Sequence, residues 1–86
     1  MKNLISKAMQ DPDNLVIELQ YTDSKKRQTR RVVSPIRFVT PNSFIALCLC
    51  REEPRVFTLK DCRNVSLKPA WDYLMPVEME VISPAA

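Results

Sequence analysis

Short segments in which apolar and polar residues alternate constrain the fold of this chain more than any other feature. From Leu15 to Tyr21, every second side chain is large and apolar, which is the period-two pattern of a half-buried β-strand. Further strand-like segments follow at residues 28–39, 43–50, 55–59 and 64–68, each separated from the next by a short turn. In a chain of only 86 residues, burial is limited, and closing a sheet on itself removes its exposed edges. The sequence therefore predicts a mainly β fold, a small five-stranded antiparallel barrel.

A short helix is predicted before the first strand, over residues 3–10. Its apolar residues recur at helical spacing, so that one face is buried, and Asn3 is a candidate N-cap. The Asp11-Pro12-Asp13 sequence ends the helix. We expect this helix to close one end of the barrel through Leu4, Ile5 and either Ala8 or Met9.

The second strand combines a strong charge with a proline. Alternation places its residues on two opposite faces, one with Arg31 and Val33, the other with Arg30, Val32 and Ser34. Pro35 cannot donate a ladder hydrogen bond, so a bend, a bulge or an edge position is predicted there. The apolar run at residues 43–50 is typical of a strand covered on both faces, and a single helical turn is predicted at residues 60–63.

The C-terminal segment differs from the rest in composition. We divide the chain into a domain at residues 1–68 and an extension at residues 69–86, which combines apolar side chains with three prolines and three acids. This extension is too apolar for a solvated linker. We expect it to pack on the barrel or on a partner chain.

Several classes of function are disfavoured by what the sequence lacks. Without glycine there is no phosphate-binding loop, and without histidine a zinc site and the usual catalytic pairs are hard to assemble. We therefore expect no enzyme activity, no cofactor and no metal. Three cysteines form no paired framework, so Cys48, Cys50 and Cys62 are predicted to be free thiols in a reducing cytoplasm. The N-terminus does not read as a signal peptide, and no segment is long enough for a membrane span.

Positive charge is concentrated in the middle of the chain, where residues 24–68 carry 11 basic and 3 acidic side chains. Such clustering attracts anions, although it is also typical of a solvated strand edge that resists aggregation. Arg31 lies within a strand beside two valines, where a charge is costly unless it is paired or meets a ligand. Its stem alone could instead cover apolar surface. The predicted binding residues are Arg31, Arg55, Arg37, Arg51, Arg30, Ser34 and Tyr21.

The order of these signals resembles the WYL domain family over residues 4–68. The resemblance depends on Tyr21 after the first strand, on Arg31 four positions before Pro35, and on the sequence Arg55-x-Phe57-x-Leu59 downstream. At the position of the Trp-Tyr-Leu signature, this chain has the tripeptide at residues 42–44, Asn-Ser-Phe. Where the family continues with Asp-Arg, residues 60–61 are Lys-Asp.

The resemblance implies an Sm-like, SH3-type barrel that senses a ligand, in a regulatory family whose members usually follow a winged-helix DNA-binding domain. Some members bind single-stranded nucleic acid through a basic face. We expect a stand-alone, non-enzymatic regulatory module that binds single-stranded nucleic acid or another anionic ligand. The alternative is a protein-interaction subunit or a homodimer that uses the apolar extension at residues 69–86.

Overall fold

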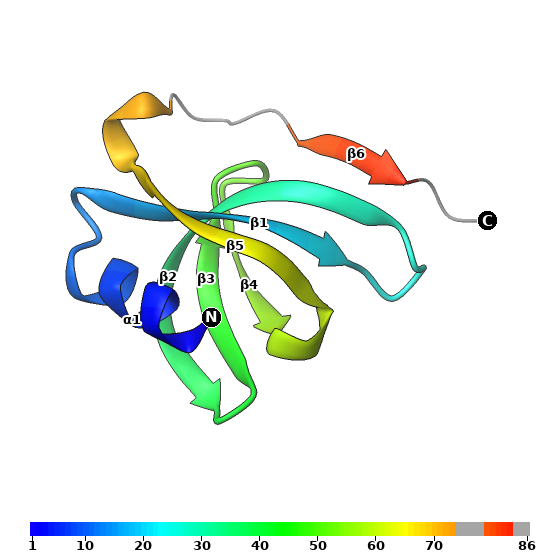
Figure 1. Cartoon of the computed structure of the whole chain (residues 1–86), viewed down its shortest axis with the longest axis horizontal. Coiled ribbons are helices and arrows are strands. Elements are labelled where there is room, and N and C mark those ends of the chain that lie inside the picture. The colour runs from blue at the N-terminus through cyan, green and yellow to red at the C-terminus, as the bar shows by residue number, and fades with distance from the viewer. Residues whose placement is uncertain (74–78, 84–86) are drawn as a thin grey trace.

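The computed structural model describes residues 1–73 and 79–83, and it is mainly β with an N-terminal helix (Figure 1). The strands are β1 (Leu15–Thr22), β2 (Gln28–Thr40), β3 (Ser43–Cys48), β4 (Glu53–Thr58), β5 (Cys62–Pro69) and β6 (Glu80–Ser83). The helical elements are α1 (Lys2–Gln10) and two single 3-10 turns, η1 (Leu59–Asp61) and η2 (Ala70–Asp72). The predicted helix and the five predicted strands are thus present, and β6 is an additional strand that the sequence did not indicate.

The strands form one antiparallel sheet in the order β4-β3-β2-β1-β5, while β6 pairs with β2 outside this path. The antiparallel prediction is confirmed. The expected closure is not found, because the two end strands of the path, β4 and β5, are not paired with each other in the described part of the chain. The turn η1 carries the chain from one end of the sheet to the other, so β4 and β5 share this turn without forming a ladder.

The sheet curls because β2 changes partners along its length. Its first half pairs with β1 as far as Val33, and its second half pairs with β3 from Val33 onward. The register with β3 shifts between Pro35 and Arg37, as expected for a residue that has no N–H to donate. The predicted bulge at Pro35 is therefore confirmed, and it lies where the strand bends.

The main core lies on the inner face of this curl. Its buried residues include Ile17, Leu19, Val33, Phe44 and Phe57. The Phe57 ring of β4 packs edge-on against the Tyr21 ring of β1, with centroids 5.0 Å apart, so the two strands meet across the curl. Stacking of Phe44 on Phe57, at 5.6 Å, extends the aromatic cluster into β3.

Helix α1 covers this core at the end of the molecule opposite β6 (Figure 1). Ile5 and Ala8 are fully buried, and Leu4 and Met9 are half-buried against the same cluster, so the predicted helical face is confirmed. No side chain caps its N-terminus, contrary to the expectation for Asn3, because the helix begins at Lys2 and Asn3 lies inside its first turn.

A second apolar cluster lies on the outer face, where Tyr73 packs against Val16, Val32 and Leu49. The backbone N–H of Ala70 donates to the carbonyl of Asn14 at 2.9 Å, which fixes the chain after β5 to this side of the sheet. Trp71 in η2 is 72% exposed. The apolar residues Leu74, Met75 and Val77 of the predicted extension lie outside the described residues.

Turns in this glycine-free chain use other residues at positive φ. Lys26, Glu52 and Asn64 have φ angles of 62°, 55° and 52°, in the left-handed region that favours glycine. Glu52 belongs to the turn after β3, in which its N–H and that of Arg51 donate to the carbonyl of Cys48. Strand β3 thus ends at Cys48, two residues before the predicted end, because the chain turns there.

The three cysteines are free thiols, as predicted, with Cys48 and Cys62 buried. Cys50 is only partly buried and lies in the turn after β3, so it is not part of the strand that contains Cys48. In the described residues, no helix has both the length and the apolar character to cross a membrane.

Candidate functional site: a buried arginine

Arg31 lies on the inner face of β2, directly opposite Leu19 of β1. Its side chain is among the largest fully buried ones of the protein, with an exposed fraction of 1%. The neighbouring inner positions on the same strand are Thr29 and Val33, both completely buried. The predicted grouping of Arg31 and Val33 on one strand face is confirmed, and the curl of β2 places this charge inside the molecule.

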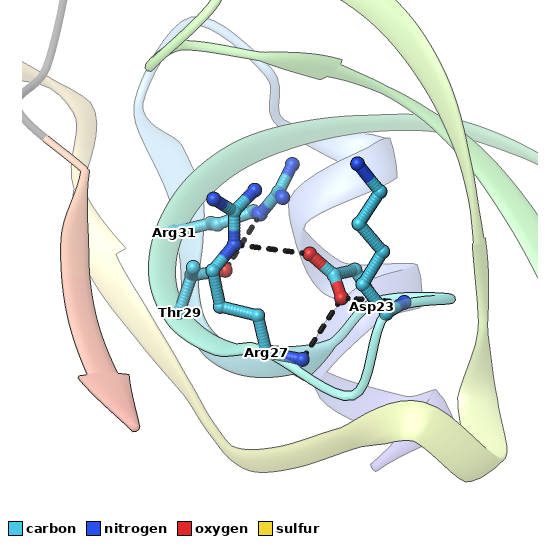
Figure 2. Close-up of polar contacts among 5 residues, drawn as sticks. Asp23, Arg27, Thr29 and Arg31 are labelled. Atoms are coloured by element: carbon cyan, nitrogen blue, oxygen red, sulfur yellow. Dashed lines mark hydrogen bonds and ion pairs between the residues drawn. The ribbon is translucent and has the colours of Figure 1, made fainter. Parts of the chain in front are cut away.

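The guanidinium group of Arg31 has one hydrogen bond and one aromatic neighbour. Its Nε donates to Oγ1 of Thr29 at 3.0 Å (Figure 2). Its Cζ lies 5.6 Å from the centroid of the Tyr21 ring. Its Nη1 is buried and has no hydrogen-bond partner among the residues that the structure describes. The Arg31 site, defined as Arg31, Thr29 and Tyr21, therefore contains a donor that is not satisfied by the protein.

No carboxylate of the described residues forms an ion pair with Arg31. The ion pairs found there join Arg27 Nε to Asp23 at 3.2 Å and Arg30 Nε to Glu18 at 3.8 Å. Burial of a charge is strongly unfavourable unless the charge is paired and hydrogen-bonded. One hydroxyl acceptor and one cation–π contact compensate only part of this cost.

The polar neighbours of Arg31 do not neutralise its charge. Burial raises the pKa of the Tyr21 phenol, and the smaller opposing effect of Arg31 does not reverse this shift. Burial likewise raises the pKa of the Cys50 thiol, which Arg31 lowers to a lesser extent. Both groups therefore keep their protons at neutral pH, and the positive charge at this site is not offset by a phenolate or a thiolate.

The acidic residue of the adjacent β1–β2 turn, Asp23, makes its hydrogen bonds within that turn. Oδ1 of Asp23 accepts the backbone N–H groups of Lys25 and Arg27, each at 2.9 Å, and Oδ2 accepts from Arg27 Nε. These contacts, led by the N–H of Arg27, lower the pKa of Asp23. Figure 2 shows Arg27 and Arg31 both directed into the curl of β2, with Asp23 bound to Arg27 rather than to Arg31. This end of the sheet consequently has an excess of positive charge.

Of the other predicted site residues, only Tyr21 contacts Arg31. Arg55 lies opposite Ala46, on the inner face by register, but it is exposed, two strands away and about 13 Å along the strand direction from the level of Arg31. Arg37 and Ser34 are on the outer face, opposite Ile45 and Leu47. The bend at Pro35 thus does not turn Ser34 toward Arg31.

The last two predicted residues lie elsewhere. Arg30 is on the outer face near Glu18, and Arg51 is exposed in the turn after β3. No ion pair joins Arg55 to Glu52 or Glu53 among the described residues. Thr29 was not among the predicted site residues, although its position two residues before Arg31 places both side chains on one strand face.

The described residues contain no cluster of three or more His, Cys, Asp or Glu side chains that could hold a metal ion. The chemistry of the site is therefore that of a planar cation with a hydroxyl neighbour, which suits a carboxylate or a phosphate group.

Comparisons of the chain with protein-family models, with curated proteins and with solved structures found no match.

Proposed function

We propose that the protein is a non-enzymatic sensing module whose ligand carries an anionic group that pairs with the guanidinium of Arg31. The observation that carries this proposal is the unpartnered Nη1 of a side chain that is only 1% exposed. An unpaired buried cation lowers stability, whereas a bound carboxylate or phosphate would convert it into a charge-assisted pair. Binding and stability are therefore coupled at this residue.

The burial of Arg31 favours a small anion over a nucleic-acid strand. A polymer that follows a basic surface would contact exposed cations, such as Lys25 and Lys26 at the tip of the β1–β2 turn, before it reached the inner face. A small carboxylate or phosphate group needs only a local opening beside Thr29. Binding of single-stranded nucleic acid is thus the alternative, which titration with DNA distinguishes from small-anion binding.

The proposal includes the fold family as well. An Sm-like, SH3-type barrel related to WYL domains is supported by the bent β2, which exchanges β1 for β3 at Val33, and by the contact between Tyr21 and Phe57 across the curl. It is further supported by the single turn η1 between β4 and β5. Under this proposal the module is regulatory, and its three free cysteines suit a reducing cytoplasm.

The experiment compares anion binding by the wild type, Arg31→Ala and Lys25→Ala. Isothermal titration with inorganic phosphate, pyrophosphate and acetate is followed by titration with a short single-stranded DNA, at low ionic strength. Arg31→Ala is expected to abolish small-anion binding, with at least a tenfold loss of affinity, because a charge-assisted pair contributes about 1.5 to 3 kcal/mol. Lys25→Ala removes an exposed charge and is expected to leave this binding unchanged.

Circular dichroism of Arg31→Ala verifies that the fold remains. DNA binding that falls equally in both variants, without small-anion binding by the wild type, would assign the charge to surface electrostatics and contradict the role of Arg31. Equal small-anion affinity in all three proteins would contradict the proposal as well.

A further inference from the structure

Strand β6 occupies an edge of β2 that β3 leaves open. Strand β3 covers this edge from Thr40 back to Val33, and the N–H of Leu49 makes a last contact with the carbonyl of Val32. The chain then turns away, so β3 does not cover the edge of β2 at residues 28–30. Strand β6 pairs with these three residues.

Strand β6 is fixed to the sheet by fewer contacts than the other strands. It has four residues and one neighbouring strand, and its register shifts between Gln28 and Thr29. Its apolar side chains Val81 and Ile82 are 48% and 38% exposed, so little apolar surface is buried with them. In Figure 1 it lies at the outside of the molecule, beyond the curl. Few buried contacts and exposed backbone hydrogen bonds are typical of segments that open at low cost.

We propose that the edge of β2 at residues 28–30 also accepts residues 79–83 of a second copy of this chain, and that two copies exchange these strands reciprocally. The occupant is a second copy because the contact that β6 makes within one chain shows that its sequence fits this edge, and an identical segment makes identical contacts. An unpaired strand edge binds an extended segment through main-chain hydrogen bonds.

The register of this exchange is defined by the pairing within one chain, in which Thr29 lies opposite Val81 and Arg30 lies opposite Glu80. When two copies associate, each β6 leaves its own sheet and pairs with the sheet of the other copy, so no backbone pairing is lost. A strand tethered to its own sheet through a short linker has an effective concentration on the order of 1 mM, so a second copy competes at about that concentration.

The test traps the exchanged strand with a disulfide between two different chains. One chain carries Arg30→Cys and the other Glu80→Cys, both with Cys50→Ser to remove the partly exposed native thiol. Cα atoms of directly paired antiparallel residues are about 4.5 to 5.5 Å apart, which allows a disulfide. The two proteins are mixed at about 1 mM, oxidised mildly and analysed by non-reducing mass spectrometry.

The expected result is a covalent heterodimer at least several times more abundant than that formed by a control mixture of Arg37→Cys and Glu80→Cys. Arg37 also lies on β2 and is exposed, but it is outside the edge that β6 uses. Adding Val81→Pro to the Glu80→Cys chain is expected to reduce cross-linking to the control level, because proline removes a backbone donor.

A heterodimer yield equal to that of the control mixture would overturn the proposal. So would heterodimer formation that is unaffected by Val81→Pro, because cross-linking would then not require strand pairing. The proposal does not depend on anion binding, and adding Arg31→Ala to both chains is expected to leave the yield unchanged.

Discussion

Nε of Arg31 donates a 3.0 Å hydrogen bond to Oγ1 of Thr29, two residues earlier on the same buried face of β2. This bond uses one of the five guanidinium donors, and the buried Nη1 has no partner in the described part of the chain. A chain selected only for stability would have an apolar side chain at this position. The pair is therefore the observation on which the proposed anion site depends.

Replacing Arg31 by methionine is expected to stabilise the protein. Methionine is flexible, fills a similar space and contains no charge, so the cost of burying an unpaired cation is removed. The expected gain in the free energy of unfolding is about 1 to 4 kcal/mol. Urea unfolding in a buffer without phosphate or carboxylate measures it.

Thr29→Val is the matched variant, because it retains the charge of Arg31 and removes the hydroxyl that accepts the Arg31 Nε–H. It is expected to lower the free energy of unfolding by about 1 to 3 kcal/mol, and the loss should disappear in the Arg31→Met background. A strong destabilisation by Arg31→Met would instead show that the guanidinium is fully compensated by its surroundings, contrary to our account.

Phe57→Ala is expected to lower the free energy of unfolding by about 3 to 5 kcal/mol. The ring is buried between Tyr21 and Phe44, so its removal leaves a cavity where β4 meets β1 across the curl. Val56→Ala on the exposed face of the same strand should change stability by no more than about 0.5 kcal/mol. Similar losses in the two variants would contradict the assignment of the inner face.

The alternation of the sequence was sufficient to separate the two faces of β1 and β2, but not to predict the end of the sheet. Leu19 lies inward, Val33 shares the face of Arg31, and Pro35 marks the bulge, because a missing N–H has a local effect. The position of β6 depends on where β3 leaves β2, a long-range relationship that no local pattern encodes. Similarly, Arg31 was predicted as a binding residue, whereas its separation from Arg37 and Arg51 follows from the bulge and the turn.

Asp23 is expected to make the stability of the protein depend on acid pH. Hydrogen bonds from the turn hold its pKa below the ordinary value of 3.8, so the unfolded chain binds the proton more readily than the folded chain. Its contribution is thus present above about pH 4 and is lost as the pH falls through the folded pKa. Asp23→Asn should reduce the difference in urea midpoint between pH 7 and pH 3.

The control for this prediction is Asp13→Asn, which changes an exposed aspartate in the turn before β1. It should leave the difference in midpoint unchanged. An Asp23→Asn variant with the acid sensitivity of the wild type would show that the turn contacts do not couple to folding.

Cys62 is expected to resist alkylation. Burial, with a smaller effect of Asp61, raises its pKa from 9.0 to about 12, and its Sγ donates to the carbonyl of Thr58 at 3.4 Å. At pH 9 the thiolate fraction is then lower than that of an ordinary thiol by a factor on the order of 500. Iodoacetamide labelling with peptide mass spectrometry should therefore modify Cys50 well before Cys62.

The stability of the folded protein is expected to fall at alkaline pH because of Cys62. The folded thiol of Cys62 keeps its proton where the unfolded thiol loses it, so the free energy of unfolding falls as the pH rises above 9.0. Labelling of Cys62 as fast as that of Cys50 in the folded protein would contradict its burial.

The most direct test of the anion site is the NMR signal of the Arg31 Nε–H group. This proton is bonded to Thr29, and its frequency responds to an anion that binds the same guanidinium. The wild type is titrated with inorganic phosphate, and the signal is assigned by its loss in Arg31→Met. Our account predicts a saturable shift for Arg31 that exceeds the shifts of Arg27 and Arg30. A shift confined to the exposed arginines, or none at any concentration, would contradict it.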